Sequence, residues 1–423
     1  MKKLMTMFFI ALLCLGLCAC GQQTAAAPTP EPTVTPEPTP EPTPEPTPEP
    51  TPKLLSFPDG SSHLDTETEL SLPELTTEQA EQLIPLLQEM PELRFVDLGN
   101  NFDDPHYERI NWAAIRKLQE ARPDVDFKYT FNFHGYDFTT LDTMLDLNHI
   151  QMFDEGEEVR ELLPCMTKCT FLDMDSCGVS SEAMAKIRDD YPNMDVVWRI
   201  WFGTNCSIRT DAERILASNL DHHLTDANTK DLKYATKVKY MDIGHNTDLH
   251  DISFMGYMPD LEVAVIAICP WRDLSPIANC KKLEYLECSE YFLSEGQVTD
   301  LAPLGELPAI KELDICKMWH VKNYEALKNL KTLDRLWIGC YTDIPEDFIP
   351  ELQAALPNTE INTTETTGSI GTWRYNEDGS NKPRYELLRQ QFQYEYYTAV
   401  SSYFGNDPLL YNNDDNRTKH VDP

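Results

Sequence analysis

The sequence predicts an α/β fold, namely a curved solenoid with a parallel sheet on its concave face and helices and short turns on its convex face. Two observations support this prediction. Apolar residues recur with further apolar residues three and five positions later, and several segments join a helix-like beginning to a strand-like end. Units of this kind cannot bury an apolar face alone, so neighbouring units must stack on one another.

The N-terminus has the layout of a bacterial secretory signal. Two lysines precede an apolar run at 4–17, which is shorter than the roughly 20 residues that a membrane-spanning helix needs. The stretch LCAC, which ends at Cys20, resembles the lipobox at which bacterial lipoproteins are lipidated and cleaved. We expect a lipoprotein signal peptide at 1–19 and lipidation at Cys20. An ordinary signal peptide cut near Ala26 is the alternative.

A spacer rich in Pro, Thr and Glu is expected at 20–53. Its repeated prolines fix φ and remove backbone donors, which excludes helices and ladders. The 25 residues at 28–52 would form a semi-rigid polyproline II segment with a length of about 75 Å. We therefore expect a domain held away from the cell membrane, outside the cytoplasm, at the cell surface or in the periplasm.

Composition narrows the class of partner. The chain has 423 residues and a formal net charge of −35. Nucleic acid demands positive charge, so we expect no nucleic-acid partner, and membrane contact only through the lipid. Acidic surfaces favour cationic partners or simply keep a secreted protein soluble. The roughly 370 residues after the spacer exceed one ordinary core, which indicates two domains or a repeat array.

Four related units follow one another in the C-terminal half. They read DISFMGYMPDLEVAVIAI (251–268), DLSPIANCKKLEYLEC (273–288), DLAPLGELPAIKELDI (300–315) and, more weakly, NYEALKNLKTLDRLWI (323–338). These units resemble leucine-rich repeats of the bacterial internalin-like class, as found in surface lipoproteins. The resemblance implies short parallel strands over a shared core and an asparagine that hydrogen-bonds backbone between coils. Asn101 and Asn246 stand at that position.

The leucine-rich-repeat domain is expected to span 54–364. Segments such as SSEAMAKIRDDYPNMDVVW combine a Ser or Thr start, helical spacing and a strand. We therefore expect convex-side helices at both ends and tighter coils between Val238 and Ile338. Residues 365–423 do not continue the repeat, and we expect them to form a C-terminal cap followed by an acidic tail.

Cysteines and histidines could indicate a metal or catalytic site. Nine cysteines follow Cys20, and several fall on repeat positions, such as Cys177 and Cys269 at the asparagine position. Buried structural thiols therefore explain them better than disulfides or a metal, and their odd number excludes complete pairing within the chain. The DHH stretch at 221–223 lacks a third ligand at zinc spacing, which favours a turn or a helix surface.

The strand pattern also predicts which side chains face out of the concave surface. The third and fifth positions of LxxLxLxx form an aromatic column beside an acidic one, broken by Val263 and Val265. Such columns suit a cationic ligand, a protein interface or a sugar ring, unless the aromatic side chains only pack on one another. The candidate binding residues are Phe95, Asp97, Phe171, Asp173, Tyr240, Asp242, Tyr285, Glu287, Asp314, Arg335 and Trp337.

These observations predict a lipid-anchored extracellular protein, not an enzyme, that binds a protein partner through its concave face. Adhesion or cell-envelope interaction would be its role, and the acidic column favours a basic partner. A glycan- or cell-wall-binding module that uses the aromatic column is the alternative, and an envelope enzyme is the weakest one. We expect no cofactor and no metal.

Overall fold

The computed structural model describes residues 51–101, 110–204, 206–218, 222–289, 299–339, 342–363 and 373–392. All of them except Thr51 belong to one structural unit that begins at Pro52. The expected signal peptide, Cys20 and the spacer up to residue 50 lie outside the described residues, as does the acidic tail. In the described part of the chain, no helix is both long and apolar enough to cross a bilayer.

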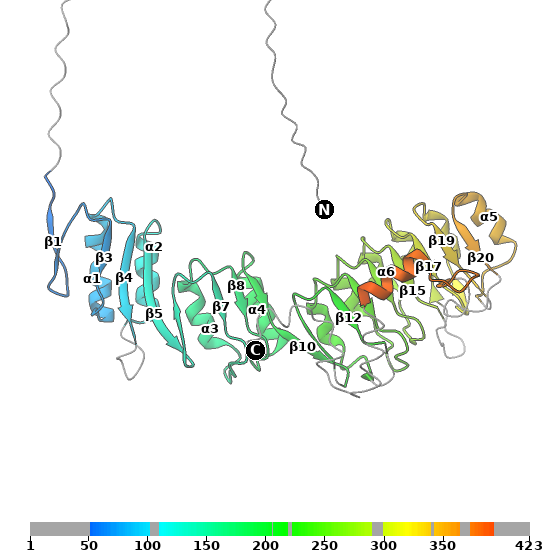
Figure 1. Cartoon of the computed structure of the whole chain (residues 1–423), viewed down its shortest axis with the longest axis horizontal. Helices are drawn as coiled ribbons and strands as arrows, with labels where there is room; N and C mark the ends of the chain where they lie inside the picture. Colours follow the sequence, from blue (N-terminus) through cyan, green and yellow to red (C-terminus); the bar gives the residue numbers. More distant parts are fainter. Residues whose placement is uncertain are drawn as a thin grey trace, which may run out of the picture. The chain divides into compact units, whose positions relative to one another are not determined.

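Short strands, nearly all paired in parallel, form three main sheets (Figure 1). The first sheet contains β3 (Glu69–Ser71), β4 (Phe95–Asn100), β5 (Asp126–Phe133) and β6 (Tyr136–Thr139). The second contains β7 (Met144–Asp146), β8 (Phe171–Asp173) and β9 (Asp195–Val197). The third contains β12 (Arg214–Leu216), β13 (Tyr240–Asp242), β14 (Val263–Val265), β15 (Tyr285–Glu287), β17 (Glu312–Asp314), β19 (Arg335–Trp337) and β20 (Glu360–Asn362). The α/β solenoid of leucine-rich repeats is thereby confirmed.

Three smaller pairs complete the strands. They are β1 (Leu54–Ser56) with β2 (Ser62–Leu64), β10 (Arg199–Phe202) with β11 (Cys206–Arg209), and β16 (Thr299–Asp300) with β18 (Val321–Lys322). Two antiparallel hairpins divide what the sequence predicts as one sheet. After β5 the chain turns back into β6 through His134 and Gly135, which both have positive φ, as a tight hairpin turn requires. After β9, the β10–β11 hairpin interrupts the repeat in the same way.

The helices follow the expected division. The α-helices are α1 (Thr77–Gln88), α2 (Trp112–Ala121), α3 (Glu157–Leu162), α4 (Ser181–Asp190), α5 (Phe348–Ala355) and α6 (Pro383–Phe392). The tighter 3₁₀ turns are η1 (Leu163–Cys165), η3 (Lys230–Tyr234), η4 (Ser253–Tyr257), η5 (Ser275–Asn279), η6 (Ala302–Glu306) and η7 (Tyr324–Asn329). Thus helices flank a central run of 3₁₀ coils, as the repeat pattern predicts.

Side chains at the element ends explain where these elements begin. Thr76 and Gln79 form a reciprocal capping box at the start of α1, and the Ser180 hydroxyl accepts a hydrogen bond from the Ala183 amide at the start of α4. In the tighter coils, the aspartate that recurs at the start of the repeats accepts the backbone hydrogen bond that begins the 3₁₀ turn. The Oδ1 atoms of Asp251 and Asp273 each accept a bond of 2.8 Å from the backbone N–H two residues later.

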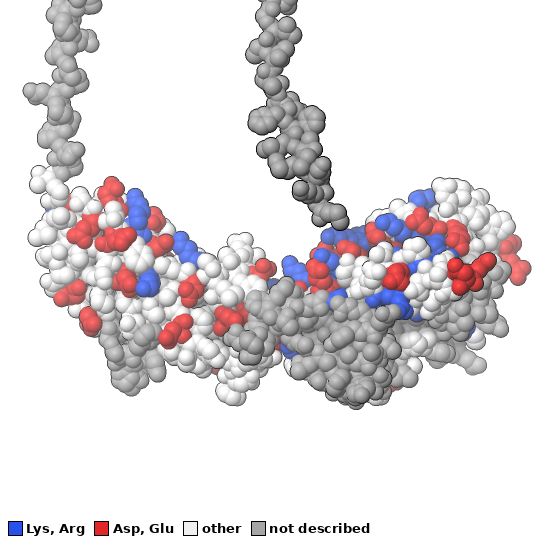
Figure 2. Space-filling model, in the orientation of Figure 1, with Lys and Arg blue, Asp and Glu red and all other residues white. Residues whose placement is uncertain are grey.

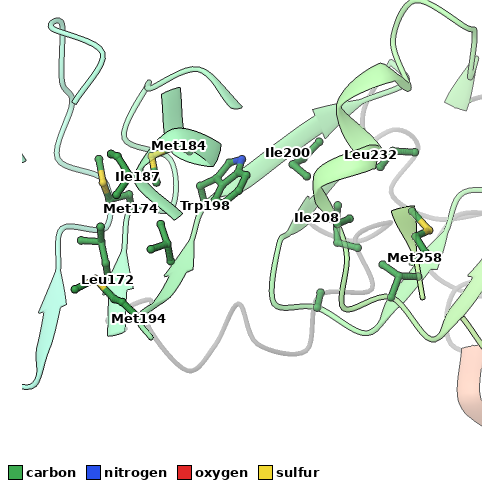
Figure 3. Packing of buried hydrophobic residues seen from close by; sticks show 14 of the residues in the cluster. Leu172, Met174, Met184, Ile187, Met194, Trp198, Ile200, Ile208, Leu232 and Met258 are labelled. Carbon is green, nitrogen blue, oxygen red and sulfur yellow. The ribbon is translucent and has the colours of Figure 1, made fainter. Parts of the chain in front are cut away.

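One apolar core runs through the repeats, and it continues past the interruption after β9. Trp198 lies there among buried side chains that include Met184 and Ile200 (Figure 3). Its indole N–H donates to the Ser181 hydroxyl at 3.3 Å. The Arg188 guanidinium lies 5.3 Å from the centre of its ring. The core therefore joins the second and third sheets even though their strands do not pair.

A ladder of polar side chains links successive coils at the asparagine position. The Asn246 amide donates to the carbonyl oxygens of Ala217 and Ile243, both at 2.8 Å. Thiols replace the amide in two other coils: Cys177 Sγ donates to the Leu147 carbonyl at 2.9 Å, and Cys269 Sγ to the Ile243 carbonyl at 3.2 Å. The structural role predicted for these two cysteines is confirmed.

Candidate functional site

The predicted register of the outward-facing positions is confirmed in the third sheet. Strand pairing places the third positions beside one another in one row, in the order Tyr240, Val263, Tyr285, Glu312, Arg335. The fifth positions form the neighbouring row, in the order Asp242, Val265, Glu287, Asp314, Trp337. The remaining candidates are not continuous with these rows, because β4 lies in the first sheet and β8 in the second.

The two candidates on β4 remain partly exposed. Asp97 Oδ2 lies 3.1 Å from the Lys128 ammonium on the neighbouring strand. Its other carboxylate oxygen accepts a hydrogen bond of 2.8 Å from the Gly99 amide. Phe95 is half-buried beside it. This part of the concave face is therefore accessible, and its acidic side chain already has a cation beside it.

Asp173 on β8 is buried and belongs to a network of ion pairs between arginine and aspartate side chains. The Arg209 guanidinium, also fully buried, lies 3.0 Å from Asp173 Oδ2 and 3.2 Å from Asp175 Oδ2. Arg209 also pairs with Asp211, and Arg199 binds Asp175 through two nitrogens at 2.7 and 2.6 Å. A carboxylate enclosed in this way holds the β10–β11 hairpin against β8 and does not face a ligand.

Burial and charge act in opposite directions on this network. Burial raises the pKa of Asp173, and the Arg209 charge only partly offsets it. Burial also opposes ionisation of Asp175, but the hydrogen bonds and charge of Arg199 hold its pKa below the usual value. The pKa of Arg209 is raised, because its aspartate partners outweigh the cost of burial.

Residues 373–392, which we call the strap, cover most of the outward face of the third sheet. The sequence predicts a cap in this segment, but the strap lies on the sheet face itself and contacts β13 through α6 (Figure 1). Its Trp373 indole N–H donates to Glu287 Oε1 at 2.8 Å and to the Tyr285 hydroxyl at 3.0 Å. Arg374 forms an ion pair with Glu287. Five candidates in these rows are buried, namely Asp242, Tyr285, Glu287, Asp314 and Trp337.

Arg335, on the sheet, contacts Trp373 at the N-terminal end of the strap. Its Nη2 donates to the Trp373 carbonyl at 3.1 Å, and its guanidinium lies 4.6 Å from the centre of the Trp373 ring. Its Nη1 binds Glu312 at 2.9 Å. The cation that the sequence analysis expects against the aromatic and acidic columns is thus supplied by the chain itself.

One open feature of the described chain is a groove with a volume of about 1040 Å³. Its walls come from β8 and β9 on one side and from β12 and β13 on the other, and they include the candidates Phe171 and Tyr240. Arg214 also lines the groove, and its Nη1 donates to the carbonyl of Gln391, a strap residue that lines the groove too, at 2.8 Å. Two candidates that the repeat pattern places in separate strands therefore line one concavity.

Both signs of charge line this groove. Its cationic side chains are Arg188, Arg214, Lys237 and Lys239, and its anionic ones are Asp195, Asp211, Glu213 and Asp260. Lys239 binds Glu213 at 2.6 Å, and this hydrogen bond raises the pKa of Lys239. Figure 2 likewise shows basic and acidic side chains interspersed around the strap. The groove is therefore not the purely acidic surface that the net charge indicates.

Sequence reasoning missed a buried contact in the β10–β11 region. The Sγ atom of Cys206 lies 3.2 Å from His222 Nδ1, and both residues are buried. The DHH stretch was expected at a turn or helix surface, which holds for the exposed His223 but not for His222. Asp221 lies outside the described residues. Only the three-dimensional fold brings these two side chains together, because the sequence separates them by 16 positions.

The other described cysteines behave as buried small side chains. All eight described cysteines, Cys206 included, are free and buried. Burial raises the pKa of Cys165 to about 11 and that of Cys177, Cys269 and Cys280 to about 12. Within the described ranges, no three His, Cys, Asp or Glu side chains are grouped so that they could hold a metal ion. These thiols are therefore poor nucleophiles and poor ligands at neutral pH.

Among solved structures, this chain is similar to leucine-rich-repeat proteins. Internalin C2 of Listeria monocytogenes is 13% identical, with 52% of this chain and 80% of that chain covered and a TM-score of 0.29. A leucine-rich-repeat protein of Leptospira interrogans is 14% identical (65% and 74% covered, TM-score 0.30). A Listeria monocytogenes internalin, InlF, is also 14% identical (73% and 85% covered, TM-score 0.26). No protein-family model and no curated protein matches the sequence.

Proposed function

We propose that this chain is a lipid-anchored protein outside the cytoplasm whose repeats bind a protein partner, for adhesion or cell-envelope interaction. The observation that carries the proposal is the open groove, because it is concave and combines aromatic and charged side chains. Phe171 and Tyr240 offer aromatic surface at its walls, and aromatic side chains commonly anchor protein interfaces. Its mixed charges favour a partner whose surface also carries both signs.

Binding to a glycan or to the cell wall has less support. Among the aromatic candidates of the third sheet, Tyr285 and Trp337 are buried beneath the strap, and only Tyr240 lines the groove. A sugar ring needs an accessible aromatic face. Glycan binding therefore enters the test below as an alternative outcome.

The full chain should be passed over an array of purified extracellular proteins and envelope glycans at low and high salt. We expect a protein to bind, with binding weakened by salt because charged side chains line the groove. The double substitution Phe171→Ala/Tyr240→Ala should abolish binding. Trp319→Ala is the matched control, since Trp319 is 54% exposed and does not line the groove. A salt-indifferent glycan hit, or a hit that the groove variant retains, would contradict the proposal.

The lipid anchor has a separate test. Cys20→Ser should release the protein from the membrane fraction and abolish incorporation of a labelled fatty acid. Cys18→Ser is the control, because a leucine precedes Cys18 where the lipobox pattern requires a small residue. Loss of labelling only in the Cys18 variant, or labelling of neither wild type nor variant, would contradict lipidation at Cys20.

A further inference from the structure

The outward face of the third sheet carries an apolar cluster that is separate from the main core. The sheet contributes Leu216, Val263, Val265, Ala267, Tyr285, Cys316 and Trp337. The strap contributes Trp373, Tyr385, Leu388 and Phe392. Since side chains alternate between the two faces of a strand, the sheet members of this cluster would face solvent without the strap. Together they form an apolar surface whose exposure to water would be unfavourable, so another segment is expected to cover it.

Opposite charges surround this cluster. The Arg374 guanidinium binds the buried Glu287, donating from Nε at 3.2 Å and also from Nη2. Further along, Arg384 Nη2 lies 3.7 Å from Glu284 Oε2, and its guanidinium lies 5.7 Å from the centre of the Tyr285 ring. At these two ion pairs the sheet supplies the carboxylates and the strap supplies the arginines. Arg384 therefore meets both an anion and an aromatic ring of the sheet, whereas the ring beside Arg374 is that of Tyr385 in the strap itself, at 5.2 Å.

The strap is held by its side chains and not as a further strand. Among the described residues, its one β-bridge joins Tyr375 to Asn381 within the strap itself. The last ladder strand, β20, pairs with β19 and not with any part of the strap. On the helix α6, Leu388 is 1% exposed whereas its neighbour Leu387 is 48% exposed, so one face of the helix lies on the sheet. This is how a separate amphipathic segment binds a surface.

We propose that the outward face of β14, β15, β17 and β19 is a binding site for a protein segment that carries arginine and aromatic side chains, and that the strap blocks this site by occupying it. This inference goes beyond the groove, because it concerns a surface that is covered in the folded chain. The strap defines the chemistry of the partner segment. It needs a buried indole or phenyl ring, and guanidinium groups placed for Glu287 and Glu284.

A synthetic, fluorescently labelled peptide with the sequence of residues 373–392 tests the proposal on the full chain. In the variant Trp373→Ala/Leu388→Ala the strap should release the surface. We expect this variant to bind the peptide at least tenfold more tightly than wild type does, measured by fluorescence polarisation. Leu387→Ala, at the exposed neighbouring position, should behave like wild type. A peptide with both Arg374 and Arg384 replaced by glutamine should bind the opened variant at least tenfold more weakly.

The proposal is overturned if the opened variant keeps the circular dichroism spectrum of wild type but binds the peptide no better. It is also overturned if the arginine-free peptide binds equally well, since the surface would then lack the stated chemistry. Should the double variant fail to fold, Arg374→Glu replaces it, because that change removes an ion pair without removing apolar surface. The same outcomes decide the test. None of the substituted residues lines the groove, but Gln391 of the strap does. Groove binding is therefore tested in chains with an unaltered strap, and peptide binding in the strap variants, so that the two can fail separately.

Discussion

Asp97 in the first sheet and Asp314 in the third occupy the same position of their repeats but meet opposite surroundings. Asp97 is partly exposed and has Lys128 at 3.1 Å. Asp314 is fully buried in the region that the strap covers, and burial, with a smaller contribution from the charge of Glu287, raises its pKa to about 7. The repeat position thus sets the direction of a side chain, whereas the segment packed on it sets its chemistry.

The largest effect on stability is expected in the buried ion network that holds the β10–β11 hairpin against β8, between the first sheet and the third. Arg209→Met should lower the free energy of unfolding by about 3–5 kcal/mol, because it leaves the buried carboxylates of Asp173 and Asp175 without this cation. Urea unfolding measures this loss. Arg116→Ala removes an exposed pair with Glu120 at 3.7 Å and should cost less than about 1 kcal/mol. Equal losses in the two variants would show that the buried network of Arg209, Asp173 and Asp175 stabilises the fold no more than an exposed ion pair does.

A second prediction compares Asp314 with Asp97 directly. The folded pKa of Asp314, about 7, lies above the usual value of about 3.9, so between these values the folded protein binds more protons than the unfolded chain. The stability that its protonated carboxyl contributes is therefore present below about pH 4 and is lost as the pH rises through about 7. Asp314→Asn does not titrate and avoids this loss.

We expect Asp314→Asn to resemble wild type at pH 4 and to exceed its unfolding free energy at pH 8 by as much as about 4 kcal/mol. Thermal or urea unfolding of both proteins at the two pH values measures this difference. Asp97→Asn should instead lose at most about 1 kcal/mol at pH 8, where it removes the Lys128 pair. A gain for Asp314→Asn that does not change with pH would contradict the assigned protonation.

The smallest effect on stability is expected from the thiol hydrogen bonds between coils, which occur in both the second and the third sheet. Cys177 and Cys269 each donate one hydrogen bond to a backbone carbonyl of the preceding coil. Replacing either by alanine removes that bond and a small buried volume, which should cost about 1–2 kcal/mol. Because the thiol makes the same kind of bond in the coils of the second and the third sheet, the two losses in urea unfolding should be similar. A loss confined to one of them would show that the ladder differs between the two sheets.

Much of the fold follows from the sequence because local patterns carry it. The apolar spacing around Leu283 and Leu286 places β15 and its partners in the correct register, and the start at Ser180 predicts α4. The Asn246 position predicts the ladder. Each of these features depends on residues within one repeat or its neighbour, so the chain displays it directly.

The candidate site depends on contacts between distant residues, and the sequence shows these poorly. Arg209 meets Asp173 across 36 positions, and Trp373 meets Glu287 across 86, so neither pair has a local pattern. One signal was nevertheless present. Val263 and Val265 are aliphatic at positions that should face solvent, and such a break in the aromatic and acidic columns indicates that another segment covers them.

The strap and the surface that it covers belong to one chain, so a free partner segment must compete with a segment that is already tethered beside its site. A covalently tethered segment acts at an effective concentration that is on the order of millimolar for short flexible connections. A free segment of the same chemistry must reach a comparable concentration, or bind more tightly by the same factor, before it displaces the strap. Weak and abundant basic peptides are therefore rejected, whereas a partner that also binds a second surface of the chain gains the avidity needed for exchange.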